Sequence, residues 1–180
     1  MKRIILALGA VVVLPFGCVF TFLVVAAGAT VVIATQAGGG LDTAPAMTRP
    51  VVGATVSLPF GCTTLALEMP DPTCPGGFRH NGIDLGAVSG TPVIAALDGT
   101  VHVVRSLTGY GLHVIVDCGD GITTIYAHLS SVVVDDGAAV ALGQQLGTVG
   151  SSGNSTGPHL HFEVRRDGVA VDPQDYVALP

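Results

Sequence analysis

Two of the six histidines in this 180-residue chain, His159 and His161, are separated by a single leucine in the segment TGPHLHFEV. The flanking residues favour an extended chain, and side chains alternate between the faces of a strand, so both imidazoles are expected on one face. A second group, RHNGIDLG, places His80 and Asp84 four residues apart across an expected Asn-Gly turn. Zinc accepts both histidine nitrogen and carboxylate oxygen as ligands at about 2.0–2.2 Å, so a metal site is one chemistry these residues could support.

A third group, TIYAHLS, contains His128 two residues after Tyr126 on an expected strand. Three histidine-bearing segments in a small β domain suggest one shared site. Taken alone, each is a weak signal, because a lone histidine is commonly a surface residue. We interpret His102 and His113 in that way, and Tyr126 is more simply explained as a packed strand aromatic.

Spacing alone leaves several explanations open for the His159/His161 pair. It could be a polar patch on a strand, or both histidines could bind metal, as in carbonic-anhydrase-like sites. A cupin-like metal oxygenase also uses such a pair, but it usually has another histidine on a following strand. No histidine follows His161, which disfavours the oxygenase.

The elements that must position these residues have the pattern of short strands. From about residue 55, apolar runs rich in Val, Ile, Thr and aromatic residues alternate with turn sequences such as DG, GYG and SSGNSTG. The segment VIVDCGDGITTIYAHL is typical of a hairpin with its turn near Asp120-Gly121. Since no later stretch has a convincing 3.6-residue apolar period, we predict an all-β, antiparallel domain over residues 55–180. Residues 36–54, which mix Gly, Pro, Ala and polar residues, are predicted to be a linker.

The N-terminal region has a different composition. Residues 4–35 carry no charge and exceed the about 20 apolar residues that a helix needs to cross a bilayer. Lys2 and Arg3 precede them, which would hold the N-terminus in the cytoplasm. We therefore expect residues 1–35 to form a single transmembrane helix that anchors an extracytoplasmic domain in the cell membrane. The alternative is a cleaved signal peptide and a secreted domain, although a signal core is only about 7–15 residues long.

Charge and cysteine content narrow the function classes. The formal net charge is −6 and the domain has no basic run, so binding to nucleic acid is not expected. Cysteines can pair outside the cytoplasm, and Cys62 and Cys74 enclose a short segment with three nearby prolines, so we expect a disulfide between them. Cys118 would then be a free thiol buried at a strand end, although it could compete for one of the others.

The motifs RHNGIDLG, YAHLS and GQQLGTVGSSGNSTGPHLHFEV, in this order, resemble the M23 family of zinc metallopeptidases, the lysostaphin-like enzymes. The segments SLPFG, GTPVIAALDGTV and GYGLHVIV match the same family, so the resemblance extends from about residue 55 to the C-terminus. Two positions depart from the family pattern. Cys62 follows PFG where an arginine is often found, and Cys118 stands where a histidine often ends the strand. Neither is a metal or catalytic position of the family.

The resemblance implies a role for each candidate residue. One zinc ion per domain would be bound by His80, Asp84 and His161, which leaves one tetrahedral position for water. His128 and His159 would lie beside the ligands and handle protons while activated water attacks a peptide carbonyl. The resemblance does not divide the roles of base and acid between them. The SSGNSTG loop is expected to line the substrate groove, since glycines allow a peptide to approach the backbone closely.

The resemblance also implies the substrate. Enzymes of this family cut peptide cross-bridges in bacterial peptidoglycan, so we expect a zinc-dependent endopeptidase that acts on them. Some family members have lost the zinc ligands and act as binding or activator modules, which is the alternative function. All five ligand and proton-handling positions are filled in this chain, and this favours the enzyme.

Overall fold

The computed structural model describes residues 24–26, 29–31 and 46–179. In the N-terminal part, β1 (Val24–Ala26) pairs antiparallel with β2 (Ala29–Val31). The helix expected over residues 1–35 otherwise lies outside the described residues, and the six positions described there are strands. In the described ranges, no helix has both the length and the apolar character needed to cross a membrane.

The chain divides into two compact units, residues 1–43 and residues 44–180. The regular secondary structure of the second unit is almost entirely short antiparallel strands, which confirms the predicted all-β, antiparallel domain. Its elements are β3 (Thr55–Leu58), β4 (Gly61–Thr63), β5 (Met69–Pro70), β6 (Phe78–His80), β7 (Ile83–Gly86), β8 (Pro92–Ile94), β9 (Gly99–Arg105), β10 (Leu112–Asp117), β11 (Ile122–Ala127), β12 (Leu129–Val132), β13 (Ala139–Val140), β14 (Gln145–Val149), β15 (His159–Arg166), β16 (Val169–Val171) and the 3₁₀ turn η1 (Pro173–Asp175).

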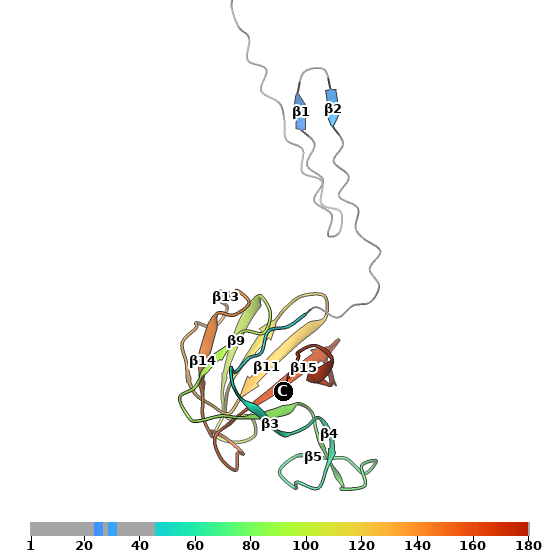
Figure 1. The fold of residues 1–180 in the computed structure, drawn as a ribbon, viewed down its shortest axis with the longest axis vertical. Helices are drawn as coiled ribbons and strands as arrows, with labels where there is room; N and C mark the ends of the chain where they lie inside the picture. The colour runs from blue at the N-terminus through green and yellow to red at the C-terminus, as the bar shows by residue number, and fades with distance from the viewer. Residues whose placement is uncertain (1–23, 27–28, 32–45, 180) are drawn as a thin grey trace, which may run out of the picture. The chain divides into compact units, whose positions relative to one another are not determined.

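The main sheet carries most of the candidate site residues. Its strands follow the order β13-β9-β10-β11-β15-β7-β3, and β16 pairs with β15. The eight-residue strand β15 lies between β11 and β7 (Figure 1). In this register His161 lies opposite Asp84 on β7 and opposite Ala127 on β11. Strand pairing therefore brings together two candidate ligands that are 77 residues apart in the sequence.

Strands β10 and β11 form the hairpin that the sequence predicts, with Val114 opposite Tyr126. The φ angles of Gly119, Asp120 and Gly121 are 78°, 48° and 74°. Glycine adopts this left-handed region freely, and aspartate tolerates it. Tyr126 is fully buried, and its hydroxyl accepts a hydrogen bond from a backbone N–H at 2.7 Å, so it is the packed strand aromatic that we expected.

The hydrophobic core begins earlier in the chain than the sequence analysis predicts. Met47, Val51 and Ala54 pack in one core cluster with buried side chains of the main sheet and of the smaller sheet β12-β14-β8. The backbone N–H of Met47 also donates to the carbonyl of Tyr176 at 3.1 Å. The predicted linker boundary at residue 54 is therefore too late, because these apolar residues are irregularly spaced and give no periodic signal.

A third sheet has the strand order β4-β6-β5, and a disulfide links β4 to the loop between β5 and β6. Cys62 and Cys74 are bonded, with their Cα atoms 5.2 Å apart, which confirms the predicted pairing. Cys118 is the free thiol among the described residues, and it is half-buried just after β10. Burial raises the pKa of the Cys118 thiol.

The two histidines interpreted as surface residues differ. His102 is exposed, as expected. His113 is buried, with Nδ1 3.0 Å from the carbonyl oxygen of Gly111 and its ring packed edge-on against Tyr110. The surface interpretation of His113 is therefore wrong, because β10 is an interior strand of the sheet and this face is covered by neighbouring side chains.

Candidate metal centre

Three strands deliver three ligand atoms to one point. His80 ends β6, the Asn81-Gly82 turn reverses the chain, and Asp84 follows on β7, while His161 comes from the adjacent β15. Glycine is required at the turn because a Cβ at Gly82 would meet the backbone carbonyl of Phe162 on β15. The close approach of this turn to β15 is what brings the three side chains together.

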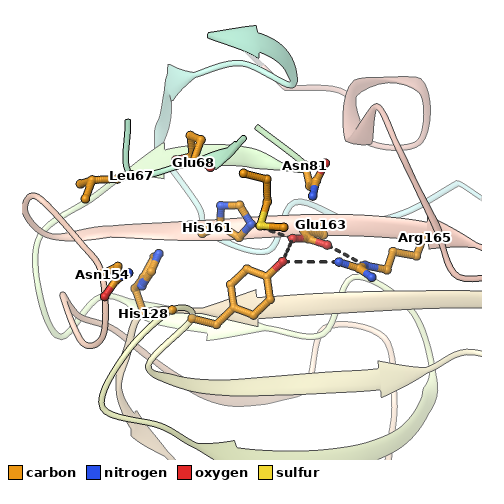
Figure 2. A pocket seen from close by; sticks show the side chains of 11 residues that line it. Leu67, Glu68, Asn81, His128, Asn154, His161, Glu163 and Arg165 are labelled. Atoms are coloured by element: carbon orange, nitrogen blue, oxygen red, sulfur yellow. Dashed lines mark hydrogen bonds and ion pairs between the residues drawn. The ribbon is translucent and has the colours of Figure 1, made fainter. Parts of the chain in front are cut away.

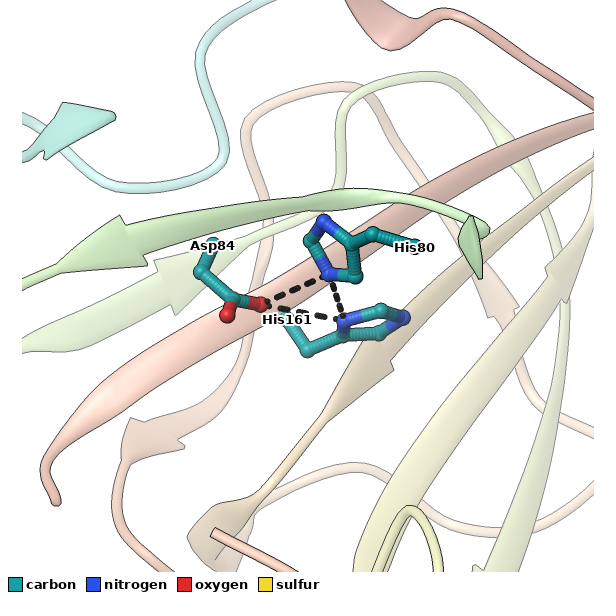
Figure 3. A group of neighbouring side chains, drawn as sticks. All are labelled: His80, Asp84 and His161. Carbon is teal, nitrogen blue, oxygen red and sulfur yellow. Dashed lines mark hydrogen bonds and ion pairs between the residues drawn. The ribbon is translucent and has the colours of Figure 1, made fainter. Parts of the chain in front are cut away.

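The three ligand atoms are in mutual contact (Figure 3). Nε2 of His80 lies 3.2 Å from Oδ1 of Asp84 and 2.9 Å from Nδ1 of His161. Nδ1 of His161 lies 3.1 Å from the same carboxylate oxygen. All three residues are buried, so water contributes little to satisfying these polar atoms.

The outward-facing nitrogens of the two histidines determine what the inward-facing ones can do. Nδ1 of His80 lies 2.9 Å from the carbonyl oxygen of Pro59, and Nε2 of His161 lies 3.0 Å from a carboxylate oxygen of Glu163. Both partners are acceptors, so each of these nitrogens must carry a proton. In the neutral imidazoles, Nε2 of His80 and Nδ1 of His161 then carry no proton, and their lone pairs face each other and the Asp84 oxygen. Three acceptors at this distance require a cation between them.

A proton can supply that positive charge in the metal-free protein. Burial opposes a charged imidazole, but hydrogen bonds to Asp84 and Glu163 outweigh it and raise the pKa of His161 to about 9. For Asp84, burial favours the neutral acid, but hydrogen bonds from His161 and His80 outweigh it and lower the pKa. The site therefore stabilises a positive charge at its centre.

A metal ion fits the same three atoms. They all lie within 4.8 Å of one another. Ligands at about 2.0–2.1 Å in tetrahedral geometry would be about 3.3 Å apart, close to the spacing observed here. Two nitrogens and one carboxylate oxygen are a zinc donor set, and three protein ligands leave the open position typical of a catalytic site. The residues predicted as ligands are thus the ones that the structure brings together.

His128 and His159 lie next to this cluster. Their rings pack edge-to-face with centroids 4.9 Å apart, and Nε2 of His159 is 3.6 Å from Oδ1 of Asp84. Nδ1 of His128 donates to the carbonyl of Ser152 at 2.7 Å, and Nδ1 of His159 donates to the carbonyl of Gly157 at 2.7 Å. In the neutral form of either ring, Nε2 is therefore the nitrogen that can accept a proton.

The sequence predicts His128 on a strand, but in the structure it does not lie on one. It occupies the bend between β11 and β12, with φ of 60°, a left-handed conformation that is uncommon for residues other than glycine. Its backbone N–H donates to the carbonyl of Tyr110 at 2.9 Å, which holds the bend. Burial, together with the nearby His159 and His161, lowers the pKa of His128 to about 4, so this imidazole is neutral at pH 7.

Three residues on the side of His161 opposite the ligand cluster were not predicted from the sequence. Glu163 is fully buried two residues further along β15, Tyr110 donates its hydroxyl hydrogen bond to Oε1 of Glu163, and Nε of Arg165 donates to Oε2 at 2.7 Å. Figure 2 shows the glutamate and the arginine on the same strand as His161. The sequence contains a signal for Glu163 and Arg165, because every second residue of a strand lies on the same face and these two follow His161 at that spacing.

A groove of about 360 Å³ opens beside the cluster (Figure 2). The residues that line it are Leu67, Glu68, Met69, Asn81, Gly109, Tyr110, His128, Asn154, His161, Glu163 and Arg165. The presence of Asn154 agrees with the prediction that the SSGNSTG loop borders the substrate groove. This loop packs tightly, since a Cβ at Gly153 would meet the carbonyl of Gly109.

Comparison with known proteins relates this geometry to a family. A family model described as Peptidase family M23 matches residues 78–173. The DD-carboxypeptidase/endopeptidase Mpg of Neisseria meningitidis is 41% identical over 132 residues, which are 73% of this chain and 29% of that protein. The murein hydrolase activator EnvC of Escherichia coli is 43% identical over 102 residues, which are 57% of this chain and 24% of that protein. The chain thus spans less than a third of the length of these relatives.

Solved structures agree with the fold. A zinc containing peptidase from Vibrio cholerae has a TM-score of 0.61 at 31% identity, covering 72% of this chain and 39% of that chain. The catalytic domain of lysostaphin from Staphylococcus simulans has a TM-score of 0.58 at 32% identity, covering 67% of this chain and 90% of that chain. These similarities confirm the all-β, lysostaphin-like architecture of the domain.

Proposed function

This chain belongs to peptidase family M23, and on that premise we propose that it is a zinc-dependent endopeptidase that hydrolyses peptide cross-bridges of bacterial peptidoglycan. The observation that carries the proposal is the convergence of three buried acceptor atoms, on His80, Asp84 and His161, beside two further histidines whose Nε2 atoms can take up protons. A binding surface alone would not need this arrangement of lone pairs around one point.

The proposed mechanism divides the work between the metal and the side chains. His80, Asp84 and His161 would hold the zinc ion, which would supply a lowered pKa of bound water and Lewis-acid polarisation of the substrate carbonyl. His128 is neutral at pH 7 and can accept the proton of the attacking water at Nε2. His159 presents its Nε2 on the same side of the cluster, where a protonated imidazole can stabilise the developing oxyanion or protonate the leaving amine. The backbone carbonyls that accept from Nδ1 of each ring keep both Nε2 atoms in place.

The substrate class is proposed from the relatives and the groove. The chain resembles the peptidoglycan DD-endopeptidase ShyA of Vibrio cholerae, which is 41% identical over 85 residues, 47% of this chain and 20% of that protein. The groove beside the cluster is bordered by Asn154 of the glycine-containing loop, and glycines allow a peptide to approach the backbone closely. We further propose that the domain lies outside the cytoplasm, where peptidoglycan is found, and that residues 1–35 anchor it or direct its export.

A second candidate function is supported by the similarity to EnvC, which is described as an activator of murein hydrolases. In that case the domain would bind a partner or the cell wall without cutting it. The filled ligand set and the neutral His128 favour the enzyme over the activator.

Elemental analysis combined with digestion of purified cell walls tests the proposal. The full chain is purified, its zinc content is measured, and it is incubated with peptidoglycan while released peptides are identified by mass spectrometry. We expect about one zinc per chain and new amino termini within the peptide bridges, and we expect neither after treatment with a strong chelator. Stoichiometric zinc without cleavage of any wall preparation would contradict the enzyme and support the activator.

A further inference from the structure

We propose that Glu163 is a positioning residue of the metal centre, which holds His161 with a proton on Nε2 and with Nδ1 directed at the metal. This inference rests on the proposed function, since it concerns how the ligand set is prepared for zinc. Nothing in the family resemblance or the comparisons assigns a role to this glutamate.

The contact between Glu163 and His161 sets the tautomer of the histidine ring. Oε1 of Glu163 accepts the hydrogen bond from Nε2 of His161 at 3.0 Å, on the side of the ring opposite the ligand cluster. A neutral imidazole carries its single proton on one of two nitrogens, and an acceptor at Nε2 selects the tautomer with a free lone pair at Nδ1. Without this acceptor, the single proton of the neutral ring could occupy Nδ1 instead, and that nitrogen would have no lone pair for the metal.

The Glu163 side chain is itself held in place by hydrogen bonds. Its side chain is fully buried, and its two oxygens accept from three donors, which are Nε2 of His161, the hydroxyl of Tyr110 and Nε of Arg165. The guanidinium of Arg165 also reaches the Tyr110 hydroxyl at 3.4 Å, which closes the network. A buried carboxylate is costly unless it is paired in this way, so an apolar residue would be the simpler filler if packing were the only requirement.

Glu163 also lies against the turn that carries the other two ligands. The Asn81-Gly82 turn, which separates His80 from Asp84, packs against the glutamate so closely that a Cβ on Gly82 would lie 2.9 Å from Cγ of Glu163. One side chain therefore contacts His161 directly and supports the turn that carries both other ligands. In metal sites, such a carboxylate behind a ligating histidine fixes the ring orientation and typically changes metal affinity 10–100-fold when it is removed.

The test compares zinc binding of the full chain and its variants by competition with a chromophoric chelator. Glu163→Gln preserves the size of the side chain but removes its charge and forces one amide N–H toward a donor. We expect it to bind zinc about 10–100-fold more weakly than wild type, with an unchanged circular dichroism spectrum. Tyr126→Phe is the matched control, because it also deletes a buried hydrogen-bonding group of the main sheet but touches none of the ligands, and it should bind zinc like wild type.

A spectroscopic readout separates positioning from general stability. In the zinc-loaded protein labelled with ¹⁵N-histidine, the Nε2–H proton of His161 should resonate at low field and exchange slowly. In Glu163→Gln it should move upfield and exchange faster, while in Tyr126→Phe it should stay unchanged. Zinc affinity within twofold of wild type and an unaltered Nε2–H signal in Glu163→Gln would overturn the inference alone. If wild type itself binds no zinc, the proposed function falls, and this inference falls with it.

Discussion

At the scale of single residues, protonation decides how the centre works. His80 and His161 each donate one ring proton outward, to Pro59 and Glu163, and this leaves two nitrogen lone pairs pointing at the Asp84 carboxylate. The protein therefore prepares the site through hydrogen bonds on the far side of each ring. Metal and proton compete for the space between the three acceptors.

This competition predicts that zinc binding releases protons. Because the pKa of His161 is raised to about 9 without metal, the ring is charged at pH 7 and must lose about one proton when zinc binds. Apparent zinc affinity should thus fall about tenfold for each pH unit below 9 until another ligand is protonated. Because the pKa of His161 is higher in the folded, metal-free domain than in the unfolded chain, the charged ring stabilises the folded state. This stabilisation is fully present at pH values below about 6.5 and is lost as the pH rises through 9.

Calorimetry in buffers of different ionisation enthalpy measures this release. We expect about one proton released per zinc at pH 7 for wild type and for His102→Ala, which removes an exposed histidine away from the site. Zinc binding with no proton exchange at pH 7 would contradict the raised pKa of His161.

The candidate ligands could be predicted from the sequence, but the hydrogen bonds that hold these ligands could not. His80, Asp84 and His161 have distinctive local spacing, and the family resemblance assigns the second histidine of the pair to the metal. Strand alternation places Glu163 on the same face as His161, but it does not reveal the hydrogen-bond partners of Glu163, because one of them, Tyr110, lies 53 positions away. His113 was misinterpreted for the same reason, since its burial depends on the strands that flank it.

At the scale of elements, the bend between β11 and β12 and the loop after β14 together hold His128. Its Nδ1 donates to Ser152, and the neighbouring Gly153, with φ of 70°, packs against the backbone of Gly109 and Gly111. The hairpin of β10 and β11 follows from alternation and turn residues in the sequence. The left-handed bend at His128 does not, because nothing in a strand-like segment such as TIYAHLS marks a break before its histidine.

A pair of glycine substitutions tests the packing of this loop. Gly153→Ala places a methyl group against the carbonyl of Gly109, whereas Gly143→Ala, with φ of 81°, has open space around the new atom. Both variants carry the left-handed strain of about 1–2 kcal/mol, so any further loss in Gly153→Ala reports the collision. We expect Gly153→Ala to be the less stable by at least about 1 kcal/mol in urea unfolding and to lose hydrolysis as well. Equal stability of the two variants would show that the loop is not tightly packed.

At the scale of the whole molecule, the sequence predicts an all-β, antiparallel domain and the pairing of Cys62 with Cys74, and both are confirmed. The helix predicted before the domain stays a prediction. The sequence places the start of the domain too late, since Met47 and Val51 already belong to the core. The order of strands in the main sheet joins segments from the whole domain, and such long-range pairing cannot be derived from local patterns.

The proposed anchor predicts a defined topology. Since Lys2 and Arg3 precede an uncharged run, the N-terminus should stay in the cytoplasm and the domain should lie outside. Protease added to intact spheroplasts should therefore digest the domain while a cytoplasmic marker stays intact. Protection of the domain until the cells are lysed would reject this orientation, and release of a soluble form that begins near residue 30 or 38 would indicate a cleaved signal peptide.

The central claim is that the five clustered residues have two different tasks, and one experiment on alanine variants tests it most directly. Zinc content by elemental analysis and turnover of a cross-bridge peptide are measured for His161→Ala, Asp84→Ala, His159→Ala and His128→Ala. The first two should lose both zinc and activity, because two remaining protein ligands hold the metal poorly. The last two should keep near-stoichiometric zinc and lose activity by about 10²-fold or more. Loss of zinc from His159→Ala as complete as that from His161→Ala would contradict the account, because both histidines of the pair would then be ligands.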